Sequence, residues 1–317
     1  MKVGKKYAWL CSLLISFLGW VGCTAETDEV KEPTEVTFQL TMEVASRAAQ
    51  SLSLDAYAVK LYLYKEVTRG TVVDYTFVKE VALDKMNFVD GKITVDGLLK
   101  GTNYKAVFLA RSLGETPELP SPTESYRNAT AAYIDGTLNG GICKETNKNI
   151  FRSIVSFQAG TQGTLSTILT RQNGALQVRI RNKKNMEKVE LRVNGHTTMY
   201  LHDGTGGQVL TKGETVPLYT ELTTQLDEPE VRIRIHLLPQ ENIKDVSGTQ
   251  NYLQITTIDG SVTKYPLKSE HNEIPIYPNQ VTWLTLGGGS AGSDFDVSFS
   301  GNINLEEDIW DGWNDNF

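Results

Sequence analysis

The sequence predicts an all-β chain folded as two β-sandwich domains. Apolar and polar residues alternate with a period of two in many short stretches, which is the pattern of half-buried strands. Turn-forming dipeptides such as Asp-Gly and Asn-Gly separate these stretches at the short intervals typical of sandwiches. No stretch of the sequence keeps the period of an amphipathic helix. We therefore expect about six or seven strands in each half.

The first half begins with its clearest strand, predicted at residues 35–44. The apolar positions of this strand alternate strictly with polar ones: Val36, Phe38, Leu40, Met42 and Val44. Further strands are expected at residues 56–64, 92–95, 104–110, 151–157 and 164–169. Residues 112–150 lack a period and are rich in Gly, Pro, Thr and Asn, so we expect a long loop region there.

In the second half the alternation resumes after Asn173-Gly174. Strands are expected at residues 176–180, 189–193, 231–237 and 281–286, with a hairpin of residues 253–258 and 262–265 around Asp259-Gly260. In two of these strands we expect the polar positions to point outward: Gln177, Arg179, Arg181, Arg232, Arg234 and His236. The sequence thus predicts a second sheet structure like the first.

These patterns divide the chain into five segments. We expect a leader at residues 1–22, an acidic tether at 23–34, a first sandwich at 35–172, a second sandwich at 173–287, and a Gly-rich linker with a terminal strand and tail at 288–317.

The leader has the composition of a secretory signal. Three lysines open the chain, and the apolar run Ala8–Val21 that follows is too short to cross a bilayer comfortably. The run ends in WVGC, which resembles a bacterial lipobox with Trp20 in place of the usual Leu. Cys23 is therefore the predicted lipidation site, where palmitate-type chains would anchor the protein without spanning the membrane. The alternative is an ordinary signal peptide followed by a chance cysteine.

The charge of the chain limits its partners. The leader holds three lysines and no acid, so its removal changes the formal net charge from −7 to −10. A chain this acidic is not expected to bind nucleic acid. An acid-rich stretch after the cysteine resembles that of surface-exported Bacteroidetes lipoproteins, which implies the outer face of the cell outer membrane. Cys143 would be left without a disulfide partner and is interpreted as a buried apolar residue.

The sequence does not predict an enzyme. It lacks the motifs of serine hydrolases, zinc proteases, phosphate loops and dinucleotide folds. The four histidines are interpreted as surface or loop residues without a third metal ligand: His196, His202, His236 and His271. The acidic C-terminal end does not match the spacing of a calcium loop and is interpreted as a solvated end. We therefore expect neither a metal nor a cofactor.

Two of the predicted strands could exchange between molecules. The first strand is followed by a small polar segment with one basic residue, so a trypsin-like protease could cut between Arg47 and Ala48. That cut would remove strand and lipid together and leave a groove of unpaired backbone groups. The second could act as a donor by β-strand addition through alternate apolar residues: Phe295, Val297, Phe299, Ile303 and Leu305. The alternative is that both strands pair within their own chain.

Several segments, in order along the chain, resemble the FimB/Mfa2 family of fimbrillin-like Bacteroidetes fimbrial subunits. They are WVGC, EVTFQLTMEVASRAA, VKLYLY, VDGLLKGTNYKAVFLA, LSTILTRQNGALQVRI, IYPNQVTWLTL and IWDGW. The resemblance implies two tandem transthyretin-like sandwiches with Greek-key topology, a lipoprotein intermediate, and other fimbrial subunits as partners. Shaft proteins of this kind are cut after an Arg in the position of Arg47, whereas anchors keep their lipid.

We therefore expect a non-enzymatic subunit of a cell-surface fimbrium (anchor, accessory or tip), held by lipid and assembled by strand complementation. The alternative is a surface glycan-binding lipoprotein of a polysaccharide-utilisation system. That function needs an exposed aromatic platform, for which Trp283, Trp310 and Trp313 are the tryptophans outside the leader. A hydrolase built from distant carboxylates is a third possibility, which no residue pattern supports.

Overall fold

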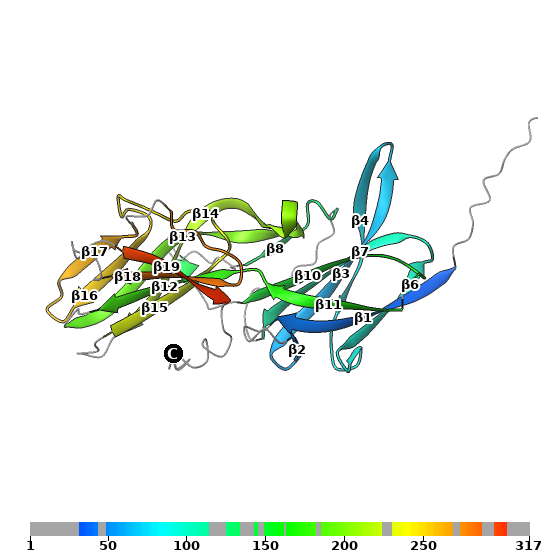
Figure 1. Ribbon diagram of the computed structural model, residues 1–317, viewed down its shortest axis with the longest axis horizontal. Helices are drawn as coiled ribbons and strands as arrows, with labels where there is room; N and C mark the ends of the chain where they lie inside the picture. Colours follow the sequence, from blue (N-terminus) through cyan, green and yellow to red (C-terminus); the bar gives the residue numbers. More distant parts are fainter. Residues whose placement is uncertain are drawn as a thin grey trace, which may run out of the picture.

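The computed structural model describes residues 32–43, 49–113, 125–133, 143–144, 149–161, 163–181, 185–223, 230–268, 273–286 and 295–302. Within these ranges the regular structure consists of strands and one 3₁₀ turn, η1 (Thr205–Gly207), and the strands form three sheets (Figure 1). The all-β expectation is therefore confirmed. No helix in these ranges is long and apolar enough to cross a bilayer. The predicted leader and Cys23 lie outside the described residues.

The first part of the chain forms a sheet of nine strands. They are β1 (Pro33–Glu43), β2 (Ala49–Ser51), β3 (Tyr57–Arg69), β4 (Val72–Ala82), β5 (Phe88–Val89), β6 (Lys92–Leu99), β7 (Asn103–Ser112), β10 (Ile150–Gln158) and β11 (Thr164–Arg171). Their order is β4-β3-β7-β10-β11-β1-β6-β5, and β2 pairs with the end of β1. Strand β11 pairs with β1 along most of its length and with β10 at its end, so it connects two layers. Apolar residues of both layers form one core between them.

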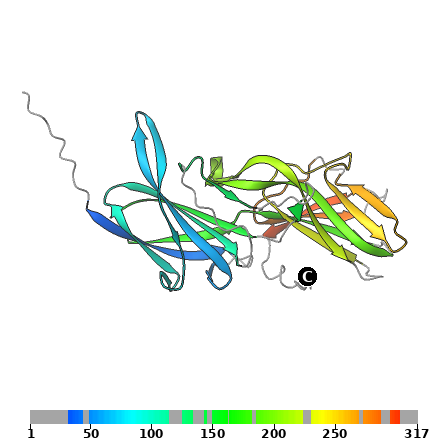
Figure 2. The ribbon, with the colours of Figure 1, turned by 180° about the vertical axis from the view of Figure 1, so that it is seen from behind.

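The second part forms the other two sheets. Its strands are β12 (Gly174–Arg181), β13 (Met186–Asp203), β14 (Val209–Thr223), β15 (Glu230–Leu237), β16 (Tyr252–Thr257), β17 (Val262–Pro266), β18 (Gln280–Leu286) and β19 (Phe295–Asn302). One sheet has the order β15-β12-β18-β19, and the other has the order β17-β16-β13-β14-β9, in which β9 (Cys143–Lys144) comes from the long loop region. In the view from behind, β13 and β14 lie in front of β18 and β19 (Figure 2). Residues of β12, β15 and β18 share a core with residues of β13 and β16.

The two parts are joined by more than the chain connection. Two short strands from the long loop region, β8 (Thr130–Ala132) and β9 (Cys143–Lys144), pair with β13 and β14 of the second part. The core of the second part also includes Tyr62 and Val107 from the first. The predicted boundary falls between β11 and β12, where Asn173 is fully buried. The division into a first and a second domain stays a prediction.

Most of the predicted strands are present, because their alternation reflects burial on one face. The apolar residues of β1 are buried while the intervening ones are not: Val36, Phe38, Leu40 and Met42. The predicted hairpin is also confirmed as β16 and β17, which pair around Gly260. Gly260 has a φ of +82°, which glycine adopts without steric cost. Gly174 is required for another reason, since a Cβ there would collide with the carbonyl of Tyr277.

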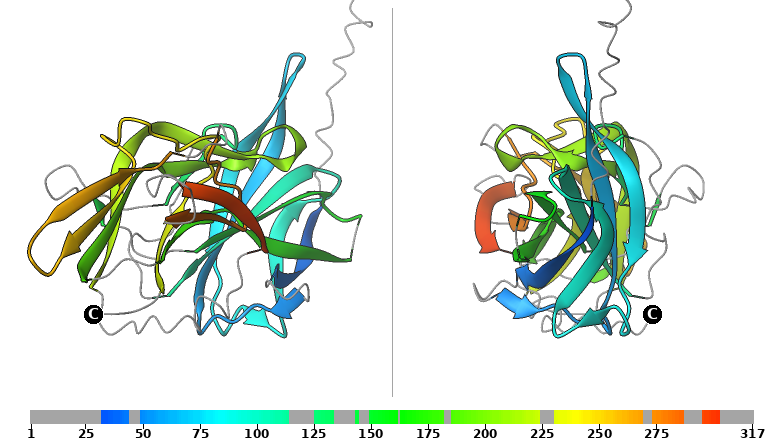
Figure 3. Two further views of the ribbon diagram at one scale, coloured as in Figure 1. Left: turned by 60° about the vertical axis from the view of Figure 1, so that its left-hand side comes forward. Right: turned by 90° about the vertical axis from the view of Figure 1, so that its right-hand side faces the viewer.

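Two long strands were not predicted from the sequence, and two residues assigned to an outer face are buried there. Strand β4 is partly exposed on both faces, and β14 buries only Val209 and Leu218 among its fifteen residues, so burial imposes no strict alternation on either strand. The outer part of the hairpin β3–β4 projects away from the rest of the molecule (Figure 3). Conversely, Gln177 and His236 lie on the outer face, as expected, but are 0 and 3 % exposed. Their side of the sheet is covered at that end, so polarity gave the correct face but did not predict the burial.

The ring of Phe38 anchors β1 in the core of the first part. It is fully buried and meets the rings of Phe108 and Phe157 edge to face, at centroid distances of 5.1 and 5.4 Å. We expect Phe38→Ala to lower the free energy of unfolding by about 3–5 kcal/mol, because it leaves a cavity in a packed core. Chemical denaturation followed by circular dichroism measures the change. Thr37→Ala, on the opposite face of the same strand, serves as the matched control, and an equal effect of both changes would refute the assignment.

The loop between β15 and β16 is organised by the carboxylate of Asp245. It accepts hydrogen bonds from the backbone N–H groups of Ser247 (2.9 Å), Gln250 (2.7 Å) and Asn251 (3.0 Å), and from the Ser247 hydroxyl. Partial burial by itself would raise the pKa of Asp245. The four hydrogen bonds outweigh that effect and hold the pKa well below its usual range.

Because the pKa of Asp245 is lower in the folded chain than in the unfolded chain, its charge stabilises the fold at neutral pH. This contribution is present above the unfolded value of about 3.9 and is lost as the pH falls through the folded value. We expect Asp245→Asn to reduce stability at pH 7 and to weaken its fall below about pH 4. Urea titrations at a series of pH values test this, and identical pH profiles of variant and wild type would contradict it.

Candidate assembly strands and the junction

Strand β1 is bonded on both sides. It runs parallel to β11, with Phe38 opposite Leu165, and antiparallel to β6, with Phe38 opposite Ile93. Its buried face contributes directly to the core of the first part. Removal of β1 would therefore expose two rows of backbone donors and acceptors together with an apolar slot.

The chain returns alongside β1 immediately after leaving it. Strand β2 pairs antiparallel with the end of β1, with Thr41 opposite Ser51 and Glu43 opposite Ala49. The predicted cleavage residues Arg47 and Ala48 belong to the connection between these two strands and lie outside the described residues. A cut in this connection would leave β2 on the body of the molecule and separate β1 from it.

Strand β19 lies at the edge of its sheet and, among the described strands, pairs antiparallel with β18 only. Three predicted donor residues lie in register with buried residues of β18: Phe295 is opposite Leu286, Val297 opposite Leu284, and Phe299 opposite Thr282. The other two, Ile303 and Leu305, lie outside the described residues. Both β1 and β19 thus pair within their own chain here, and their exchange between molecules stays a prediction.

The two strands belong to opposite parts of the molecule. Figure 1 shows β1, in blue, in the sheet of the first part and β19, in red, in the second part. A β19 strand that filled the slot of β1 would therefore come most simply from a neighbouring molecule.

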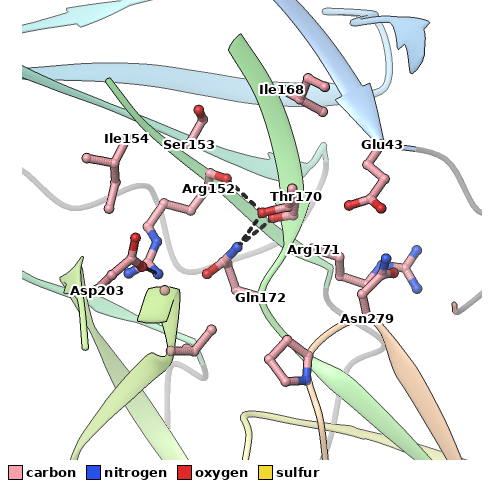
Figure 4. A pocket seen from close by; sticks show the side chains of 13 residues that line it. Glu43, Arg152, Ser153, Ile154, Ile168, Thr170, Arg171, Gln172, Asp203 and Asn279 are labelled. Carbon is pink, nitrogen blue, oxygen red and sulfur yellow. Dashed lines mark hydrogen bonds and ion pairs between the residues drawn. The ribbon is translucent and has the colours of Figure 1, made fainter. Parts of the chain in front are cut away.

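Between the two parts lies a polar pocket of about 410 Å³. Arg152 and Asp203 line one side of it, and Glu43 at the end of β1 and Arg171 line the other (Figure 4). Gln172 donates hydrogen bonds to the carbonyl and the hydroxyl oxygen of Thr170, at 2.8 and 2.9 Å. The pocket therefore lies where the end of β1 approaches the second part of the chain.

Arg152 is the main polar connection across this junction. Its guanidinium, 3 % exposed, donates to the carbonyls of Tyr200 (2.8 Å) and His202 (3.2 Å) in β13, and it forms an ion pair with Asp203. Burial lowers the pKa of Arg152, and the carboxylate of Asp203 opposes that shift. Sequence reasoning missed this residue. The sequence does contain a signal for it: Arg152 lies on the same strand face as the apolar residues Ile150 and Ile154 of β10. A charged residue in that position predicts a buried ion pair.

The other residues considered for chemistry do not come together. Within the described ranges no three His, Cys, Asp or Glu side chains are placed to hold a metal. His202 lies against the ring of Tyr200 at 5.0 Å, and burial lowers the pKa of His196. His236 is buried rather than exposed, which corrects its interpretation as a surface residue. His271 lies outside the described residues, as do Trp310 and Trp313, and only the backbone of Cys143 is described.

Comparisons with known proteins give a fold and no family. No family model matches the sequence, and no curated protein sequence matches it. A candidate polysaccharide-binding protein of Bacteroides thetaiotaomicron has a TM-score of 0.51 at 11 % identity, over 86 % of this chain and 99 % of that one. The fimbrial anchor protein Mfa2 of Porphyromonas gingivalis scores 0.45 at 11 % identity, over 85 and 98 % of the chains. The C-terminally truncated tip fimbrial protein Mfa3 of the same organism scores 0.42 at 14 %, over 84 and 98 %. The first of these comparisons shows a shared fold.

The Arg152 connection can be tested by removing the guanidinium. We expect Arg152→Met to lower the free energy of unfolding by about 2–3 kcal/mol, since it leaves two buried carbonyls and a carboxylate without their donor. This is below the value for a fully buried pair because Asp203 is 37 % exposed. Thermal and urea denaturation measure the loss. Arg127→Met, at a side chain that is 67 % exposed, is the control, and equal stabilities of the two variants would contradict the role of Arg152.

Proposed function

We propose that this chain is a structural subunit, as anchor, accessory or tip, of a cell-surface fimbrium. It is exported as a lipoprotein acylated at Cys23, held at the outer membrane, and joined to other fimbrial subunits by β-strand complementation. Two tandem transthyretin-like sandwiches, residues 35–172 and 173–287, are part of this proposal. The shared fold and the ordered sequence segments described above support it.

The observation that carries the proposal is the position of β1. This strand is the first in the described chain, yet it lies in the interior of a sheet, between β11 and β6. Residues 44–48 alone connect it to β2 and the rest of the chain. A terminal strand can be withdrawn or replaced without unthreading the rest of the fold, which makes such strands the natural units of exchange.

Strand β19 is the donor in this proposal. Its apolar residues Phe295, Val297 and Phe299 have the period-two spacing of Phe38, Leu40 and Met42, so the same slot can receive them. Because donor and slot belong to different parts of the molecule, each contact is heterologous. Repeated heterologous contacts build a filament when the rotation between neighbours does not close a ring, which is the arrangement that a fimbrium needs.

Of the three tryptophans that the glycan-binding alternative could use, the described part of the chain contains Trp283. Trp283 is half-buried, and the guanidinium carbons of Arg179 and Arg232 lie 4.9 and 6.0 Å from its ring centre. Affinity electrophoresis against a panel of glycans separates the two functions, because retardation would support glycan binding.

We expect Val297→Asp with Phe299→Asp to abolish incorporation of the protein into fimbriae, because two charges cannot enter an apolar slot without partners. Ser298→Asp, between them, is the matched control, which we expect to be incorporated. Immunogold labelling and quantification of sheared fimbriae measure incorporation, with surface labelling of whole cells to show equal export of all variants.

The N-terminus of the native protein, read by mass spectrometry, gives its position in the fimbrium. An acylated Cys23 identifies a retained anchor, and a free Ala48 identifies a processed subunit. The proposal fails if the double variant reaches the surface and assembles as efficiently as wild type.

A further inference from the structure

The outer face of the sheet β15-β12-β18-β19 concentrates positive charge. Residues directly opposite one another in register place four arginines on this face, together with the ring of Trp283: Arg179 and Arg181 of β12, and Arg232 and Arg234 of β15. We call this surface the arginine face. Its opposite side is the apolar core side, where Val178 and Ile233 are fully buried. Such a cluster is unexpected in a chain with a formal net charge of −7.

Acidic partners on the arginine face are few. Glu230 lies 3.1 Å from Arg179, 2.9 Å from Arg181 and 2.8 Å from Arg232, so one carboxylate is shared among three guanidinium groups. Asp296 of β19, opposite Thr285, lies two strands away from Arg179. The four arginines are therefore in excess over the acids that the described sheet provides.

One end of the arginine face is covered. Ala175, Gln177, Val281 and His236 are 0–3 % exposed, although they lie on the outer side of an outer sheet. Among the described apolar residues, Ala175 and Val281 cluster only with Trp283. Toward the other end the face opens, and the side chain of Arg181 is 47 % exposed.

The covered end also holds an amide donor without an acceptor. The Gln177 Oε1 atom accepts hydrogen bonds from Arg234 at 2.9 and 2.6 Å. The Gln177 Nε2 atom is buried and has no acceptor among the described residues. A buried amide donor costs free energy unless an acceptor faces it. The site therefore requires an occupant with acceptor oxygens beside apolar groups.

We propose that the occupant is the acidic C-terminal segment of this same chain, residues 306–317. It contains five carboxylates, no basic residue, and two tryptophans: Glu306, Glu307, Asp308, Asp311 and Asp315, with Trp310 and Trp313. Its carboxylates pair with the guanidinium groups, which match carboxylates in planar geometry, and one faces the Gln177 amide. Its tryptophans extend the small apolar cluster around Trp283.

The position of β19 brings this segment to the correct place. The last residue of β19, Asn302, is opposite Gln280, next to the covered end of the arginine face. Arg179 lies about 20 Å from Asn302, because the two residues are separated by five positions along the strands and by two strand spacings across the sheet. About six extended residues span that distance, so the carboxylates of Asp308, Asp311 and Asp315 can reach the guanidinium groups.

The test measures how well the full chain protects its own C-terminal segment from a Glu-specific protease, by following release of the peptide 308–317. We expect Arg179→Gln with Arg232→Gln to release it roughly tenfold faster than wild type, since two charge pairs are lost. Raising the salt to about 1 M should accelerate release from wild type in the same way, because the Debye length falls to about 3 Å. Excess synthetic peptide 303–317 should do so by competition.

The matched control is Arg69→Gln with Arg127→Gln, which removes the same charge from exposed positions outside the arginine face. It should release the peptide at the wild-type rate. If the arginine-face variant does not fold, the salt and competition measurements on wild type decide. Equal rates under all conditions would overturn the proposal. So would protection that increases with protein concentration, since that would place the segment on a second copy. None of these measurements depends on fimbrial assembly.

Discussion

The requirement that every backbone group in a sheet be paired governs this molecule. The backbone of strand β1 pairs with β11 on one side and with β6 on the other. Its apolar side chains pack in the core of the first part. Its loss would leave both neighbours unpaired and expose the apolar residues around Phe108. The fold of the first part therefore cannot persist with an empty slot. Any process that removes β1 must be coupled to the arrival of another strand, and this links folding of the subunit to its assembly.

The alternation of apolar and polar residues predicts a strand only where one face of the strand is buried and the other is exposed to solvent. That condition holds for β1, and the sequence located it correctly. It fails for β4 and for most of β14, where neither face is consistently buried and the sequence has no strict period. It fails in the opposite sense for Gln177 in β12, which lies on the predicted outer face but is buried there, as are its neighbours on the inner face. The alternation of apolar and polar residues reflects a difference in burial between the two faces of a strand. It gives no signal when both faces are equally buried or equally exposed.

The junction could not be predicted for a different reason. Arg152 and Asp203 are 51 residues apart in the sequence, and only the packing of β10 against β13 brings them together. A single sequence shows that Arg152 alternates with apolar residues of its strand and therefore needs an acidic partner when buried. It does not show which of the many Asp and Glu residues that partner is. The positions of strands β1 and β19, by contrast, were predictable, because each strand is contiguous and its spacing follows from strand geometry alone.

The two terminal strands differ in how easily they can exchange. Strand β19 is bonded on one side only, to β18, so its departure breaks one ladder. Strand β1 is bonded on both sides and carries part of the core, so its departure breaks two ladders and opens a cavity. The edge strand is therefore the natural donor, and the interior position is the natural acceptor. An exchange in the opposite direction would lose an interior strand to fill an edge that is already stable when open to solvent. The direction of assembly proposed above follows from this asymmetry.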